Sequence, residues 1–167
     1  MPMIVVGVDG SDSAQEALRF AVREARLRGS AVRAVMASNI TTTAYAGIGG
    51  FGPDADPTKL EETARTVLDE AVDSVAEGCD VEIDRVLDVG QPVQVLIEES
   101  RDAELLVVGS RGRGGFAGML LGSVSHQCAM HAHCPVVIVR PTVPGGPDAS
   151  RAVERDRDAP LHTGGPQ

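Results

Sequence analysis

Glycines and small hydroxyl residues gather in the second half of the chain, in a spacing that suits the binding of a phosphate group. Glycines let a backbone approach a polyphosphate without a Cβ clash, and successive N–H groups can form an anion-binding nest. A helix that begins just beyond them would add unpaired N–H groups and a favourable dipole. The two segments are Gly109-Ser110-Arg111-Gly112-Arg113-Gly114-Gly115 and Gly122-Ser123-Val124-Ser125.

The surroundings of this loop decide between two interpretations. In the simpler one, the glycines form a flexible turn and the serines cap a helix. However, a buried strand pattern precedes the loop, a helix start follows it, and Arg111 and Arg113 add positive charge. Ser123 and Ser125 offer hydroxyl donors to phosphate oxygens. Because a glycine motif is informative only in such a context, the combination favours phosphate binding.

An acidic residue follows another apolar run, residues 4–8, where the chain reads Gly7-Val8-Asp9-Gly10-Ser11. A carboxylate at the end of a strand can accept hydrogen bonds from ribose hydroxyls or a base. Asp9 could equally cap the first helix, which is a common use of Asp before a helix. Gly7 would keep the end of the strand open to close approach of a ligand.

Histidines and cysteines lie close together near residue 130, but their spacing matches no standard zinc site. Histidines that interact with a helix C-terminus explain them more simply. The three cysteines are odd in number and lack redox spacing, so we expect reduced thiols. The residues concerned are His126, His131 and His133, with Cys79, Cys128 and Cys134.

Apolar runs alternate with helical patterns along the chain. The predicted strands cover residues 4–8, 31–37, 81–89, 105–108 and 135–139. A capping box of Ser13 and Glu16 predicts the first helix, which Gly29 ends. Further helices are predicted from Asp56-Pro57 to Gly78, after residues 90–92, and from about residue 122 to residue 133.

This alternation predicts an α/β fold, an open five-stranded parallel sheet with helices on both faces, of the Rossmann-like kind. Such sheets bind ligands beyond the carboxyl ends of their strands, at the point where the strand order reverses. Asp9 and Gly109 each stand at such an end. Residues 38–56 lack a period and predict a long loop.

Length, net charge and composition indicate which partners and which location to expect. The chain has 167 residues and a formal net charge of −9, which argues against nucleic acid as a partner. We expect no signal peptide and no membrane span, and hence a cytoplasmic protein. Residues 142–167 are rich in Pro, Gly, Asp and Arg, so we expect one nucleotide-binding domain over residues 1–141 and a disordered tail.

Three blocks together resemble one family. Gly109-x2-Gly112-x9-Gly122-Ser123 is similar, spacing included, to the nucleotide motif of the ATP-binding universal stress proteins. Residues 4–11 and 131–139 look like the opening and closing blocks of the same family. The resemblance covers about residues 3–140, and nothing in the motif departs from the ATP-binding branch.

The resemblance implies an adenine nucleotide alpha hydrolase-like fold that binds ATP. Gly7 and Asp9 would flank the adenosine, and Ala37 would touch adenine through its backbone. The phosphates and ribose would be held by Gly109, Gly112, Gly122, Ser123, Val124 and Ser125. Ser110, Arg111, Arg113, Gly114 and Gly115 belong to the same loop but match the pattern less strictly.

The resemblance also implies a homodimer through the last strand, Val136 to Val139. The resulting expectation is a stress-response module that binds ATP, with Mg²⁺ held mainly by the nucleotide, and that hydrolyses little or none of it. A slow ATPase or phosphotransferase with the same pocket is one alternative. A protein that uses nucleotide to order residues 38–56 for an unknown regulatory partner is another.

Overall fold

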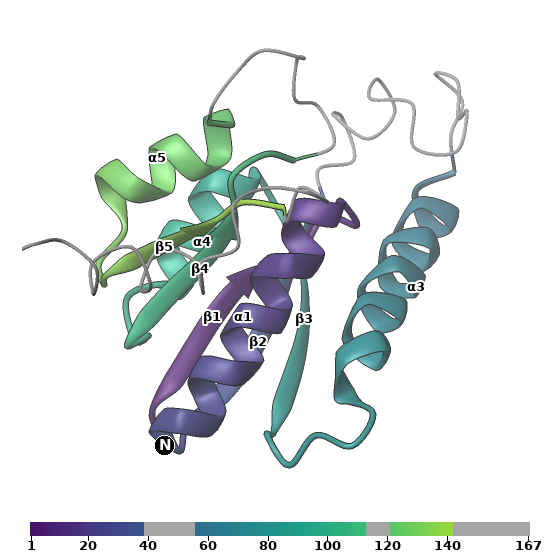
Figure 1. Ribbon diagram of the computed structural model, residues 1–167. Helices are drawn as coiled ribbons and strands as arrows, with labels where there is room; N and C mark the ends of the chain where they lie inside the picture. The colour runs from purple at the N-terminus through teal and green to yellow at the C-terminus, as the bar shows by residue number, and fades with distance from the viewer. Residues whose placement is uncertain (39–55, 113–120, 142–167) are drawn as a thin grey trace, which may run out of the picture.

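The computed structural model describes residues 1–38, 56–112 and 121–141 (Figure 1). Most of the predicted loop, the predicted tail and the predicted site residues Arg113, Gly114 and Gly115 lie outside these ranges. The described elements are β1 (Met3–Gly7), α1 (Asp12–Arg28), β2 (Ala31–Ser38), α3 (Pro57–Ala76), β3 (Ile83–Val89), α4 (Pro92–Glu99), β4 (Leu105–Gly109), α5 (Ser123–His131) and β5 (Val136–Val139).

The sheet has five strands in the order β3-β2-β1-β4-β5, and each neighbouring pair is parallel. From β1 the chain first builds β2 and β3 on one side, and then crosses to build β4 and β5 on the other. The strand order therefore reverses between β1 and β4, which end at Gly7 and Gly109. This arrangement confirms the predicted Rossmann-like α/β fold and its switch point.

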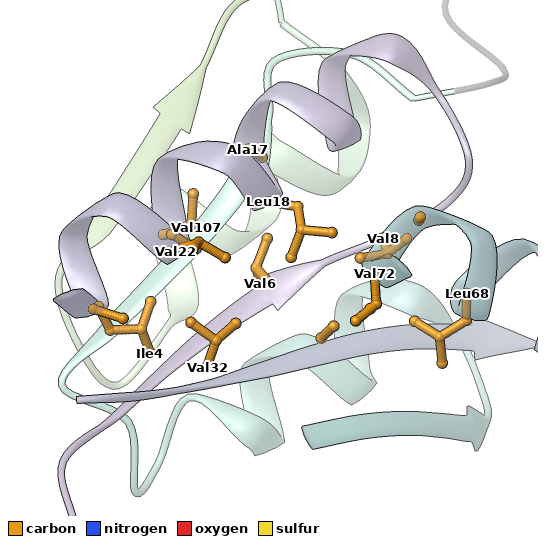
Figure 2. Packing of buried hydrophobic residues seen from close by; sticks show 14 of the residues in the cluster. Ile4, Val6, Val8, Ala17, Leu18, Val22, Val32, Leu68, Val72 and Val107 are labelled. Atoms are coloured by element: carbon orange, nitrogen blue, oxygen red, sulfur yellow. The ribbon is translucent and has the colours of Figure 1, made fainter. Parts of the chain in front are cut away.

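Side chains of the central strands point alternately to two buried clusters, as the strand period requires. On one face, α1 and α3 cover the sheet, and Leu18 and Leu68 belong to one buried cluster with Val6 and Val32 (Figure 2). On the opposite face, α4 and α5 contribute Leu96 and Cys128 to the second cluster. Burial on both faces explains why β1 and β4 are almost entirely apolar.

The start of α1 corrects one prediction. The N-cap is Ser11, which has extended backbone angles and accepts from the backbone N–H of Ala14, so the helix begins at Asp12. Ser13 is therefore not the N-cap of a capping box with Glu16, because it already lies within the helix. The C-cap prediction is confirmed, since Gly29 has a left-handed φ of 68°.

The remaining predicted elements differ from the structure only at their ends. Asp56 caps α3 by accepting from the N–H of Thr58, and Pro57 occupies the first helical position, as predicted. Strand β3 begins at Ile83 and not at Val81, whose N–H donates to the Cys79 sulfur in the turn before the strand. Strand β5 lies at an edge of the sheet.

Candidate functional site

A cavity of about 410 Å³ opens at the carboxyl ends of β1, β2 and β4, at the predicted switch point. Residues of α1, α4 and α5 and of the loops that follow β1 and β4 form the rest of its wall. The lining residues are Gly7, Val8, Asp9, Ala14, Val35, Ala37, Pro92, Leu96, Val108, Gly109, Arg111, Gly112, Gly122, Ser123, Val124 and Ser125.

The structure brings ten of the fourteen predicted site residues to this cavity. Ser110 is not one of them: its side chain is buried, its N–H donates to the Val139 carbonyl at 2.7 Å, and its carbonyl accepts from the Gly122 N–H at 2.8 Å. Ser110 therefore ties the glycine loop to β5 and α5. The other three, Arg113, Gly114 and Gly115, lie outside the described residues.

One part of the cavity wall is apolar, where Val35, Leu96 and Val108 belong to the same buried cluster. Its residues suit a flat, uncharged ring better than a phosphate. Sequence reasoning missed these residues because apolar side chains at strand ends look like ordinary core positions. The only available signal was Pro92, which marks a helix start directly after a strand. Over the whole wall, the lining residues that the sequence did not reveal are Val8, Ala14, Val35, Pro92, Leu96 and Val108.

Ala37 offers backbone groups at this apolar side. The Val35 carbonyl accepts from the Val8 N–H at 2.8 Å, so Val35 directs its backbone groups toward β1. Residues two apart on a strand direct their backbone groups to the same side. Ala37 therefore directs its N–H and carbonyl toward the same side as Val35, beyond Gly7, where β1 ends.

The other side of the cavity is polar and favours anions. Helix α5 begins after Gly122, and among the described residues no side chain caps its first N–H groups. The first turn of a helix leaves such donors unpaired within the helix and carries partial positive charge. Ser123 is exposed in this turn, and exposed Arg111 lies beside it. The arrangement is that of an anion-binding helix N-terminus.

The sequence predicts that the Ser125 hydroxyl donates to a phosphate, whereas in the structure it donates to backbone carbonyls. It is buried and donates to the carbonyls of Ser110 and Gly122, at 3.2 and 3.1 Å. It thereby holds the glycine loop against the start of α5. Its backbone N–H belongs to the first turn of α5, whose N–H groups lack partners within the helix.

Asp9 lies between the apolar and the polar sides. One of its oxygens, Oδ1, accepts from the Ser11 N–H at 2.9 Å and from the Ser11 hydroxyl at 2.6 Å. Asp9 does not cap α1, because Ser11 does so. The alternative of a helix-capping Asp9 is thus resolved: the carboxylate belongs to the wall of the cavity.

The glycines of the loop differ in how much room their surroundings leave for a side chain. A Cβ atom on Gly109 would lie 2.7 Å from the carbonyl carbon of Ser13, so this glycine permits close packing of β4 against α1. A Cβ on Gly112 would lie 2.6 Å from Oδ2 of Asp9. A Cβ on Gly122 would meet its nearest neighbour at 3.4 Å, an ordinary contact.

Ser13 is a further residue whose place in the site the sequence did not reveal. Its hydroxyl is buried at the junction of α1, β5 and the glycine loop. It lies 3.3 Å from the N–H of Arg111, from which it accepts, and 3.3 Å from the Val139 carbonyl, to which it donates. The side chain fixes the direction in which the loop leaves β4.

In the described part of the chain, no three His, Cys, Asp or Glu residues gather around a common point. Burial raises the pKa of Cys128 to about 11, and burial also raises the pKa of Cys134. Within the described ranges, no helix is long and apolar enough to cross a membrane.

Comparisons with known sequences give a consistent result. The model of the universal stress protein family matches residues 1–140. A universal stress protein of Mycolicibacterium smegmatis is 40% identical over 141 residues, which are 83% of this chain and 45% of that protein. Universal stress protein Rv2623 of Mycobacterium tuberculosis is 38% identical over 139 residues, which are 82% of this chain and 44% of that protein. The chain thus spans about half the length of these relatives.

Solved structures agree with this assignment. A universal stress protein in complex with cAMP is 29% identical with a TM-score of 0.61, and the match covers 84% of this chain and 98% of that one. The universal stress protein of Archaeoglobus fulgidus in complex with dAMP is 30% identical with a TM-score of 0.59, covering 83% and 97%. With its five-stranded sheet and the match of the family model over residues 1–140, this chain belongs to the universal stress protein family.

Proposed function

We propose that this chain binds ATP in the cavity at the switch point. We further propose that it acts as a nucleotide-dependent regulatory module and hydrolyses little or none of the ATP. The observation that carries the proposal is the division of one cavity into an apolar side and an anion-binding side, with Asp9 between them. This division matches the order of base, sugar and phosphates in a nucleotide. The cAMP and dAMP complexes of two similar proteins support it.

Each part of the nucleotide has a matching part of the site. Adenine would lie against Leu96 and Val108, with the backbone of Ala37 at its edge. Ribose hydroxyls would donate to Asp9. The phosphates would accept from the backbone of Gly112 and from the first turn of α5, with Arg111 and Ser123 beside them. Gly7 would leave room for Leu96 at the wall.

The residues that line the cavity argue against rapid hydrolysis of ATP. Backbone donors and a helix dipole hold ground-state phosphates, whereas catalysis needs interactions that strengthen in the transition state. Asp9 is the only carboxylate among the described lining residues; its Oδ1 already accepts two hydrogen bonds from Ser11, and its proposed ligand partner is the sugar. Any Mg²⁺ would be bound mainly by the phosphate oxygens of the nucleotide.

Binding is tested first with the wild-type chain. Mass spectrometry of small molecules released from the purified protein is expected to find an adenine nucleotide. Calorimetric titration with ATP, with GTP as the control for the base, is expected to give a one-to-one complex for ATP. Failure to bind ATP, AMP or any other adenine nucleotide would refute the proposal.

Turnover is tested separately. Radiolabelled ATP incubated with excess protein and Mg²⁺ is expected to stay intact for many minutes, far below ordinary enzyme rates of about 1–10³ per second. Stoichiometric ADP formed within seconds in the wild type, and not in Ser123→Ala, would instead favour a slow ATPase or phosphotransferase with the same pocket.

A further inference from the structure

We propose that Ser11 is a positioning residue: its hydroxyl fixes the Asp9 carboxylate and thereby gives the site its preference for a ligand that carries sugar hydroxyls. The inference rests on the proposed nucleotide function. It assigns a role in ligand choice to a residue that does not line the cavity itself.

The contacts around Ser11 are short and converge on one atom. Its N–H and its hydroxyl both donate to Oδ1 of Asp9, at 2.9 and 2.6 Å. Hydrogen bonds to an ionised carboxylate are the stronger kind, and a length near 2.6 Å is typical of an O–H donor to such a group. Both donors lie on the same side of the carboxylate.

This pair of bonds holds Oδ1 in place, which limits where the second oxygen can lie. The terminal torsion of an aspartate is broad, so a carboxylate without such partners turns easily. With Oδ1 held by Ser11, Oδ2 is directed toward Gly112, where a Cβ would approach it to 2.6 Å. Gly112 belongs to the anion-binding side of the cavity. The carboxylate is thus oriented before a ligand arrives, which lowers the entropic cost of binding.

The same hydroxyl also caps α1. Its oxygen accepts from the N–H of Ala14 at 3.2 Å while its proton goes to Asp9. A hydroxyl can donate and accept at once, whereas an ionised Asp, another good N-cap, can only accept. A serine at this position therefore connects the rigid start of α1 to the carboxylate in the cavity.

A fixed acceptor at this place distinguishes ligands by their sugar. An oriented carboxylate raises the affinity for a ligand whose sugar donates a hydroxyl, and does not raise the affinity for a sugar without one. Ser11 would therefore contribute to the affinity for ATP but not to the affinity for 2′,3′-dideoxy-ATP, which has the same base and phosphates. The ratio of the two dissociation constants measures this contribution.

The experiment compares both ligands by calorimetry in four proteins: the wild type, Ser11→Ala, Ser11→Thr and Gly29→Ala. Threonine keeps a hydroxyl and is the conservative variant. Gly29→Ala is the matched control, because it strains the opposite end of α1, where φ is +68° and no atom would meet the new Cβ within 4 Å. It lowers the melting temperature without touching Asp9.

We expect the wild type to bind dideoxy-ATP about tenfold more weakly than ATP, as a hydrogen bond to a charged group implies. In Ser11→Ala the ratio is expected to fall to about threefold or less, through weaker ATP binding alone. Ser11→Thr and Gly29→Ala are expected to keep the wild-type ratio. A loss of stability alone would not change this ratio, so the measurement separates positioning from capping.

Two results would overturn the inference: a wild-type ratio near one, or an unchanged ratio in Ser11→Ala. If Ser11→Ala does not fold, Ser11→Gly replaces it, because glycine is an acceptable N-cap and also lacks the hydroxyl. A wild type that binds neither ligand would refute the proposed function as well, which distinguishes that failure from a failure of the role of Ser11.

Discussion

Oδ2 of Asp9 and the backbone of Gly112 approach each other so closely that a Cβ atom on Gly112 would lie only 2.6 Å from this oxygen. The two residues follow β1 and β4, the strands on either side of the switch point. The sugar side and the phosphate side of the proposed site thus meet at one contact. The glycine is needed there for space, since its φ is not in the left-handed region.

Gly112→Ala is therefore expected to weaken ATP binding by about tenfold or more, because either the loop or the carboxylate must move. The fold is expected to persist, since the altered contact lies at the wall of a cavity. Gly78→Ala is the control: its φ of 70° makes it strained, but it lies outside the cavity. Isothermal titration and thermal melting check both variants, and unchanged affinity in Gly112→Ala would contradict the close contact.

Gly109→Ala is expected to destabilise the fold itself. Its Cβ would come within 2.7 Å of the Ser13 carbonyl carbon and 2.9 Å of the Ala14 nitrogen, both backbone atoms that cannot rotate away. Overpacking of this kind costs about 1–3 kcal/mol in free energy of unfolding. Urea denaturation followed by circular dichroism measures the loss. A midpoint equal to that of the wild type would show that α1 does not pack on β4 as described.

Cys128 is expected to make stability depend on alkaline pH. Burial raises its folded-state pKa from 9.0 to about 11, so both states are protonated below pH 9 and the contribution is fully present there. Between about pH 9 and 11 only the unfolded state loses the proton, which lowers the free energy of unfolding by up to about 2 kcal/mol. Urea midpoints of the wild type and Cys128→Ala, measured from pH 8 to pH 11, isolate this slope. Parallel curves for the two proteins would contradict it.

The outer edge of β5 is expected to form a homodimer. The Leu106 N–H donates to the Pro135 carbonyl and the Ser110 N–H to the Val139 carbonyl, so odd-numbered residues of the segment face β4. By alternation, Val136 directs its backbone N–H away from β4, toward the open edge. An exposed edge is a template for a second strand, and a symmetric pair would cover it.

Val136→Pro is therefore expected to weaken the dimer, because proline removes this N–H and leaves the bonds to β4 intact. Val136→Ala keeps the N–H and controls for the loss of side-chain contacts. Sedimentation velocity is expected to show a dimer for the wild type and for Val136→Ala, and also for a chain truncated after Pro141. A wild type that is monomeric at micromolar concentration would exclude this interface.

The sequence by itself determined the order and type of the elements. Apolar runs buried on both faces, Asp56-Pro57 before α3 and Gly29 after α1 are local signals, and local backbone preferences decide them. The alternation of strands and helices then left few topologies, since crossovers are right-handed. Gly7, Asp9 and Gly109 could be predicted at the carboxyl edge because each follows an apolar run.

Only the tertiary structure decided what individual residues do at that edge. Ser11 and not Ser13 caps α1, because the chain is still extended at Ser11. The glycine motif predicts ligand contacts for both Ser110 and Gly109, yet Ser110 bonds to β5 outside the cavity, and Gly109 lines the cavity while also permitting the packing of α1. Such roles depend on neighbours from distant segments, and spacing along one chain does not encode these distances. For the same reason the apolar wall at Leu96 and Val108 emerged only when β4 and α4 were placed together.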